Sequence, residues 1–158
     1  MTLNSSRTGK NTTKFSRGLY KPKNPQKYIG NINEIWFMSS WELDVCKFLD
    51  TNPKILRWGS EIVAIPYFKR ATGRMHKYYI DFYVKYVDVR GKIRESLWEV
   101  KPFNQTKKPK RTKRKKESTF LYEHSTYETN MDKWHAAQEF CNKKGIEFRL
   151  LTEKDIFI

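Results

Sequence analysis

Residues 78–101, YYIDFYVKYVDVRGKIRESLWEVK, predict two antiparallel β-strands joined by a tight turn, and this hairpin decides the fold. The first strand, 77–88, is rich in Tyr, Ile, Phe and Val, which favour strands. Residues 89–91 end on a glycine, as three-residue hairpin loops commonly do. The second strand, 92–101, stops before Pro102. We therefore expect two long neighbouring strands at the centre of a sheet.

The register of this hairpin brings two carboxylates together. Counting back from the loop gives the opposed pairs Asp88–Lys92, Asp81–Glu99 and Tyr79–Lys101. Directly opposed side chains have Cβ atoms about 5 Å apart, so like charges there repel each other unless something neutralises them. Mg²⁺ does so, because it favours one or two carboxylates with water and phosphate oxygens. Lys101 follows Glu99 on the same strand face, which completes a layout for metal-assisted phosphodiester hydrolysis.

Asp81 also has an ordinary interpretation. Alternation along the strand places Ile80, Phe82 and Val84 on one face and Asp81 on the other. If that second face is half-solvated, an aspartate there needs no function.

Glu42 lies in a helix predicted over 39–50. Ser39, three residues earlier, makes a capping-box pattern in which Glu42 only stabilises the start of the helix. At about 100° per residue, however, Glu42 projects toward the apolar stripe of Val45 and Leu49. A carboxylate on that stripe needs a compensating partner, such as a metal ion or a lysine. The sequence leaves both interpretations open.

The other elements extend the hairpin into an α/β domain. Strands are predicted over 61–68 and 146–151, and a second helix over 130–144, which a glycine ends. The expected order is helix, three strands, helix, strand, around a small mixed sheet. Cys46 and Cys141 match no disulfide or metal spacing, so we expect two buried thiols.

The net charge of +15 comes from two segments that contain no acidic residue. Residues 1–29 hold seven of the 32 Lys and Arg and residues 101–116 hold nine, so the remainder is almost neutral. We expect a basic extended arm over 1–33 and a domain over 34–158, with a basic flexible loop over 103–118 inside it.

These cations predict binding to double-stranded DNA, because clustered positive charges release its counterions. A solubilising or localising tail is the alternative. No apolar run approaches 18 residues and the loop has no apolar face, so no membrane association is expected. A small-molecule substrate is not expected either. The candidate DNA-binding residues are Arg7, Lys10, Lys14, Arg17, Lys107, Lys108, Lys110, Arg111, Lys113, Arg114, Lys115 and Lys116.

Asp81 followed by Glu99-Val100-Lys101 resembles the motif of the PD-(D/E)xK nuclease superfamily, whose core has the same element order. Ile80 stands where the family carries a proline before the aspartate. Ser39-Ser40-Trp41-Glu42 resembles the branch that contains transposon end-cleaving endonucleases, and its glutamate resembles the N-terminal acid of the family. The resemblance implies a restriction-endonuclease-like fold.

The resemblance also implies roles. Asp81 and Glu99 would hold Mg²⁺ or Mn²⁺, with Glu42 as a further acidic ligand, directly or through water. Lys101 would position or help to deprotonate the attacking water. Two more residues lie where related nucleases carry polar groups: Glu61 and Lys133. The ordinary interpretations, an exposed acid at a strand end for Glu61 and a solvated helix face for Lys133, are favoured over a role in the site.

Longer stretches resemble the head-completion proteins of large contractile-tailed phages, including 4–15 (NSSRTGKNTTKF), 18–22 (GLYKP), 27–30 (KYIG) and 65–67 (IPY). This resemblance implies a nuclease that finishes the DNA-filled head before tail joining. Its partners would be DNA and head, portal or neck proteins, in the host cytoplasm during assembly and in the virion. Two alternatives remain: a non-catalytic protein of the head–neck junction that binds DNA or the portal, and a junction resolvase or transposase subunit.

Overall fold

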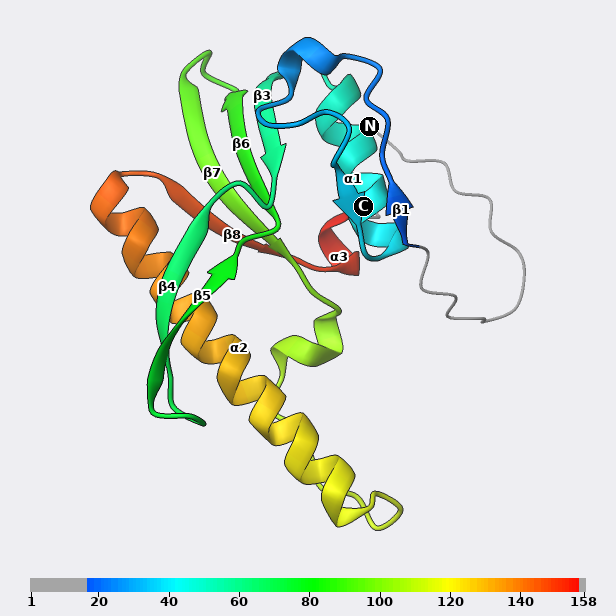
Figure 1. Cartoon of the computed structure of the whole chain (residues 1–158), viewed down its shortest axis with the longest axis vertical. Coiled ribbons are helices and arrows are strands. Elements are labelled where there is room, and N and C mark those ends of the chain that lie inside the picture. Colours follow the sequence, from blue (N-terminus) through cyan, green and yellow to red (C-terminus); the bar gives the residue numbers. More distant parts are fainter. Residues whose placement is uncertain (1–16, 157–158) are drawn as a thin grey trace, which may run out of the picture.

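The computed structural model describes residues 17–156, and its centre is a four-stranded mixed sheet with the order β3-β6-β7-β8 (Figure 1). The first three strands are antiparallel neighbours, and β8 runs parallel to β7. Along the chain, this sheet and its two long helices come in the order α1 (Ser40–Thr51), β3 (Ile55–Ser60), β6 (Phe82–Val87), β7 (Ile93–Val100), α2 (Glu117–Lys144) and β8 (Glu147–Leu151). This matches the predicted order of helix, three strands, helix, strand, except that the first strand of the sheet is β3 and not the segment predicted over 61–68.

A separate antiparallel pair, β4 (Ala64–Lys69) and β5 (Arg74–Tyr79), is inserted between β3 and β6. The strand predicted over 61–68 is β4, and the sequence analysis missed β3. The single strand predicted over 77–88 is wrong, because β5 pairs with β4 whereas β6 pairs with β3 and β7. Tyr79 consequently lies opposite Ala64 and not opposite Lys101.

The chain changes partners at Ile80. Its N–H donates to the carbonyl oxygen of Val63 at 3.1 Å, and its side chain is fully buried. The predicted alternation is wrong here, because Ile80 packs in the core beside α2 whereas Phe82 and Val84 pack in the core beside α1. The chain therefore joins the four-stranded sheet only from Phe82 onward, where β6 begins.

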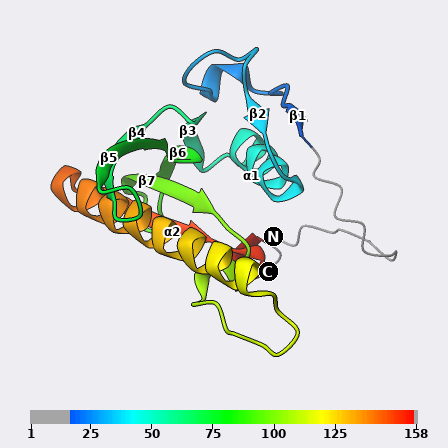
Figure 2. The same ribbon diagram turned by 60° about the horizontal axis from the view of Figure 1, so that its bottom comes forward.

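Each face of the sheet is covered by one of the long helices (Figure 2). On one face Trp58 and Phe82 pack against Cys46 of α1. On the other, Leu97 packs in one core with Cys141 of α2. Both thiols are free and fully buried, as predicted.

Helix α2 has 28 residues and begins 13 positions before the predicted start at residue 130. Its first half projects beyond the sheet, and the basic loop joins it to the short η2 helix (Phe103–Thr106) (Figure 1). The helix ends as predicted at Gly145, whose φ of 67° is in the left-handed region that glycine tolerates best. Within the described residues, no helix is both long and apolar enough to cross a membrane.

Residues 17–33 pack onto the domain, although the sequence analysis placed them in an extended arm. Short strands β1 (Gly18–Leu19) and β2 (Trp36–Phe37) pair with each other. The η1 helix (Pro25–Lys27) lies between these two strands in the chain, and the side chains of Tyr20 and Tyr28 on either side of it are buried in the core.

The fully buried Asp50 at the end of α1 holds this segment in place. Its carboxylate accepts hydrogen bonds from the Tyr20 hydroxyl at 2.7 Å and from the N–H groups of Lys23 at 2.7 Å and Asn24 at 2.9 Å. Lys27 Nζ also donates to the Asp50 carbonyl oxygen at 3.0 Å. The last helix, α3 (Glu153–Ile156), contacts α1.

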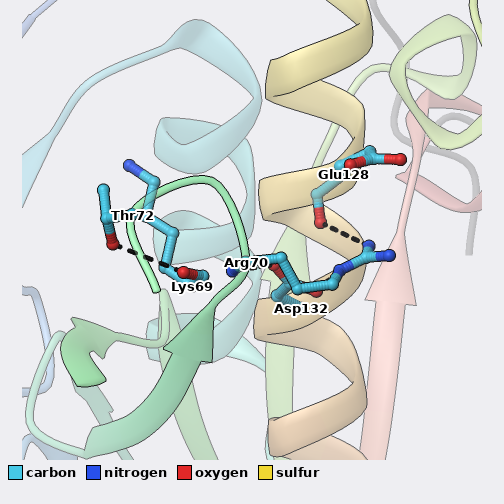
Figure 3. Close-up of polar contacts among 5 residues, drawn as sticks. All are labelled: Lys69, Arg70, Thr72, Glu128 and Asp132. Atoms are coloured by element: carbon cyan, nitrogen blue, oxygen red, sulfur yellow. Dashed lines mark hydrogen bonds and ion pairs between the residues drawn. The ribbon is translucent and has the colours of Figure 1, made fainter. Parts of the chain in front are cut away.

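The turn of the β4–β5 hairpin is fastened to α2 by Arg70 (Figure 3). Its Nε donates to Asp132 Oδ1 at 2.6 Å, and its Nη2 donates to the carbonyl oxygen of Glu128 at 3.4 Å. Thr72 Oγ1 closes the turn by donating to the carbonyl oxygen of Lys69 at 3.3 Å. The hairpin is thereby held against the middle of α2.

Candidate active site

The β6–β7 pair has the predicted register, from Val87–Ile93 to Phe82–Trp98. Continuing this register by one residue puts Asp81 across from Glu99, just before β6 begins. At the loop end, the N–H of Asp88 donates to the carbonyl oxygen of Lys92 at 2.8 Å, as that register requires. Gly91 adopts a φ of 76°, the left-handed value expected of the last loop residue. A local turn therefore sets the opposition of two distant carboxylates.

Asp81 is fixed through its side chain and its backbone. Its Oδ2 accepts the N–H of Val100 at 2.8 Å. Val100 lies on β7 beyond the last residue that pairs with β6. Its carbonyl oxygen accepts the N–H of Glu61 at 3.0 Å. Glu61 has a φ of 52°, a left-handed conformation that is uncommon for a side chain of this size and is often found at functional sites. The Asp81 carboxylate is thus held at the edge of β7.

Glu99 is almost completely buried, with 4% of its surface exposed. Its Oε1 lies 3.4 Å from Nζ of Lys101, which confirms that the two side chains share one face. Its Oε2 is buried and finds no hydrogen-bond partner in the described part of the chain. A buried carboxylate oxygen without a donor is costly, so this atom is suited to an external ligand.

Burial raises the pKa of both carboxyl groups. The pKa of Asp81 is well above its ordinary value, first because of burial and then because of the charge on Glu99. The pKa of Glu99 is raised by burial, while the ammonium group of Lys101 acts against this shift. A carboxyl group whose pKa is raised by its surroundings and by a neighbouring carboxylate, as that of Asp81 is, is a common feature of catalytic sites.

Glu42 caps α1 and also faces the site. Ser39 Oγ accepts the N–H of Glu42 at 3.2 Å, and Glu42 Oε2 accepts the N–H of Met38 at 2.8 Å. The capping interpretation is therefore correct in geometry. Burial raises the pKa of Glu42, the charge on Glu61 adds to the shift, and Lys101 opposes it. Both Glu42 and the exposed Glu61 thus lie within electrostatic range of the other acids.

Lys133 reaches the site from α2. Its half-buried Nζ lies 5.8 Å from the ring centre of Tyr67 and 5.5 Å from that of Tyr78, whose hydroxyl donates to the Lys133 carbonyl oxygen at 3.0 Å. Burial lowers the pKa of Lys133, as does the charge on Lys101, while Glu99 raises it. Lys133 is therefore only partly exposed to solvent. No pattern in the sequence pointed to the two tyrosines, because β5 was not separated from β6.

The donor set suits a hard divalent cation that also binds water or phosphate. No three His, Cys, Asp or Glu side chains in residues 17–156 converge closely enough to complete a metal site by themselves. Asp81 and the unpartnered Glu99 Oε2 supply two carboxylates, which is the number that Mg²⁺ commonly takes from a protein. The residues present fit such an ion.

The candidate DNA-binding cations divide into three groups. Arg7, Lys10 and Lys14 lie outside the described residues. Arg17 is exposed. In the loop, Arg111 pairs with Glu117 on α2, Lys115 Nζ lies 2.7 Å from Glu123 Oε2, and six others are exposed: Lys107, Lys108, Lys110, Lys113, Arg114 and Lys116.

Comparison with known proteins relates this architecture to one nuclease family. The profile of the TnsA-like endonuclease N-terminal domain matches residues 52–153, which contain Asp81, Glu99 and Lys101. The chain belongs to the TnsA-like endonuclease family. Its mixed sheet and flanking helices accordingly have the restriction-endonuclease-like fold, as expected. Glu42 precedes the matched region.

This TnsA-like chain also has a relative that aligns over most of its length. A head completion nuclease from Enterobacteria phage T4 is 40% identical over 139 residues, which cover 86% of this chain and 90% of that protein. The expected kinship with phage head-completion nucleases is thus confirmed.

Proposed function

We propose that this TnsA-like chain is a divalent-metal-dependent DNA endonuclease of the PD-(D/E)xK type that acts in phage head completion. The observation that carries the proposal is the buried Glu99 Oε2, which has no hydrogen-bond partner among the described residues and lies beside Asp81 and Lys101. Its relative is named for nuclease action in head completion, which supports the same context.

Asp81 and Glu99 would hold Mg²⁺ or Mn²⁺, and Glu42 would contribute directly or through a water molecule. When bound, such an ion polarises a phosphoryl oxygen and makes a bound water a better nucleophile. The hydrogen bond from the N–H of Val100 keeps Asp81 Oδ2 in a fixed orientation toward β7. Preorganisation of this kind avoids reorienting the ligand during the reaction.

Lys101 would orient the attacking water, help to remove its proton and stabilise charge on the phosphate. Its ammonium group is only partly exposed and is held 3.4 Å from Glu99 Oε1, so its position is restricted. Lys133 would add a second positive charge from α2. Electrostatic stabilisation by such groups contributes a large part of phosphoryl-transfer catalysis.

The exposed cations of the basic loop and Arg17 would grip the DNA backbone without reading sequence. Head, portal or neck proteins would be the protein partners, in the host cytoplasm during assembly and in the virion. Arg7, Lys10 and Lys14 would extend the grip from the N-terminal arm.

Cleavage of supercoiled plasmid and linear duplex DNA tests the proposal. Purified protein is incubated with Mg²⁺, Mn²⁺ or EDTA, alongside Glu99→Gln, Lys101→Ala and the control Lys143→Ala, an exposed lysine in the last turn of α2. We expect metal-dependent cleavage by the wild type and the control, and about a 100-fold or larger loss in the two site variants.

Equal background in all four proteins, together with tight and salt-sensitive DNA binding, would instead support a non-catalytic protein of the head–neck junction. A branched duplex in the same assay separates the remaining alternative. Strong preference for the branch would indicate a junction resolvase with the same chemistry.

A further inference from the structure

A hollow, called here the Lys69 hollow, lies next to the candidate active site, between the end of β4 and the first half of α2. Its volume is about 260 Å³. Lys133, whose ammonium group interacts with Glu99 and Lys101, also lines this hollow. The other lining residues that matter here are Lys69 from β4 and Ser125, Thr126, Thr129 and Asn130 from α2.

The chemistry of this hollow suits a phosphate group. Lys69 and Lys133 bring two positive charges close enough for each to affect the other, since Lys69 contributes to the lowered pKa of Lys133. The hydroxyl and amide groups on α2 can all donate hydrogen bonds. None of the described residues lining the hollow carries a carboxylate. Phosphate oxygens only accept hydrogen bonds, and lysine, serine, threonine and asparagine are common partners for them in DNA complexes.

A neighbouring hollow of about 470 Å³ between the same hairpin and α2 has the opposite character. Phe68 and Met131 line it with apolar surface, and Glu139 and Asp132 bring negative charge. Its one arginine, Arg70, is already paired with Asp132 at 2.6 Å (Figure 3). Positive charge without a partner carboxylate is therefore a property of the hollow that adjoins the active site.

The lining residues of α2 form a stripe that leads away from the carboxylates. Positions 122, 125, 126, 129, 130 and 133 recur at three- and four-residue spacing, so they share one face of the helix. At 1.5 Å per residue, the stripe from Tyr122 to Lys133 is about 16 Å long, or about five nucleotide steps of a DNA strand. Beyond Tyr122 lies the N-terminus of α2, where the basic loop leads into the projecting half of the helix (Figures 1 and 2).

We propose that the DNA strand cut at Asp81 and Glu99 continues along this stripe, with one backbone phosphate bound between Lys69 and Lys133. This inference rests on the proposed nuclease function and defines the path of its substrate. The path explains why α2 extends 13 residues beyond the predicted core helix, because the extension connects the active site to the basic loop. Tyr122, 74% exposed at the end of the stripe, offers a ring on which a base can stack.

The test compares Lys69→Ala with Lys77→Ala, which removes the same charge from an exposed position on β5 of the same hairpin. Duplex binding is measured in EDTA at several salt concentrations. We expect Lys69→Ala to lose several-fold in affinity and to lower the slope of log K against log salt by about 0.9, the value for one phosphate contact. Lys77→Ala should leave the slope unchanged.

A second measurement locates the contact on the DNA. A single neutral methylphosphonate is moved along the strand within five steps of the cleavage position. One substitution should weaken binding by the wild type and have no further effect on Lys69→Ala. Equal behaviour of Lys69→Ala and Lys77→Ala, or no such position, would overturn the inference. Cleavage of the same duplex by the wild type with Mg²⁺ is scored separately, so a failure of the nuclease proposal remains distinguishable.

Discussion

Asp81 and Glu99 bring two carboxyl groups close together, and the ammonium group of Lys101 lies next to Glu99. The ammonium group of Lys101 lies 3.4 Å from Glu99 Oε1. Among residues 17–156, the one hydrogen bond to Asp81 Oδ2 comes from the N–H of Val100. Burial of a second negative charge is unfavourable without a counter-ion. The local arrangement therefore lowers folding stability, which is the cost expected if the two carboxylates have the proposed role of binding a cation.

The variant Asp81→Asn should make the metal-free protein more stable. The pKa of Asp81 is raised in the folded state, so its protonated form favours folding at low pH and this contribution is lost as pH rises through that pKa. Asparagine removes the charge, and its Oδ1 can still accept the N–H of Val100. We expect a higher Tm at pH 7.5, by about 2–4 °C for each kcal/mol gained in a domain of this size.

Melting curves with and without Mg²⁺ complete this comparison. The wild type should gain Tm on addition of Mg²⁺, whereas Asp81→Asn should not. At pH 4 a larger fraction of the wild-type carboxyl group is protonated than at pH 7.5, so the Tm difference between the two metal-free proteins should become smaller. A lower Tm of Asp81→Asn at both pH values would contradict the assignment of unfavourable charge to this position.

Glu42→Gln separates the two roles of Glu42. Glutamine keeps an oxygen that can accept the N–H of Met38, so we expect a change of less than about 0.5 kcal/mol in the free energy of unfolding. Glu42→Ala removes the cap and should lose about 1 kcal/mol. If Glu42 also serves the site, Glu42→Gln should lose at least ten-fold in cleavage rate. Full activity of this variant would leave Glu42 with its capping role alone.

At the scale of elements, the hairpin register could be predicted because it depends on local chain geometry. Residues 89–91 form the turn, and each pair before it follows by counting. The break at Ile80 could not be predicted, because it depends on pairing with Val63 and burial against α2, both set by distant parts of the chain. A strand-forming composition continues through the break, so periodicity alone gives no warning.

The start of α2 escaped prediction for a related reason. Its first half projects beyond the sheet and is mainly polar, so it lacks the apolar repeat that marks a packed helix. Lys116 at the N-cap makes no side-chain capping bond. The end of α2 could be predicted from Gly145, because the left-handed conformation that ends a helix is a local requirement that glycine meets best. The hollow between Lys69 and Lys133 could not be predicted from the sequence, because neither the first half of α2 nor a separate β4–β5 hairpin was predicted.

The contact between residues 20–27 and α1 should depend mainly on Asp50. Asp50→Ala leaves the Tyr20 hydroxyl and two backbone N–H groups without their acceptor, so we expect a loss of about 3 kcal/mol in the free energy of unfolding. Tyr20→Phe removes one of these bonds and should lose about 1 kcal/mol. Urea titration followed by fluorescence measures both. A smaller loss for Asp50→Ala than for Tyr20→Phe would show that the segment is held by other contacts.

At the scale of the whole molecule, positive charge is distributed along a line that begins at the carboxylates. Lys101 and Lys133 lie at the candidate active site, and Lys69 lines the Lys69 hollow. The loop cations follow at the N-terminal end of α2. The two loop cations that pair with glutamates on α2 tie the loop to the helix, which leaves its other cations to face solvent. The cations that anchor the loop are thus different side chains from those proposed to bind DNA.

The loop can therefore be tested by neutralising only its unpaired cations. In this variant glutamine replaces Lys107, Lys108, Lys110, Lys113, Arg114 and Lys116, and the ion pairs of Arg111 and Lys115 with α2 are kept. If every cation contacts a phosphate, the slope of log K against log salt should fall by about 5, because each contact contributes about 0.9. The cleavage rate at saturating DNA should stay within about two-fold, because these residues do not touch the carboxylates.

The matched control is the double variant Lys143→Gln/Lys144→Gln, which removes charge from the opposite end of the same helix. Its slope should change little, since no part of the proposed DNA path reaches that end. An unchanged slope in the loop variant would support a solubilising tail in place of a DNA-binding loop. A large fall in the rate at saturating DNA would instead place the loop at the scissile phosphate, and the path along α2 would then have to bend back toward the sheet.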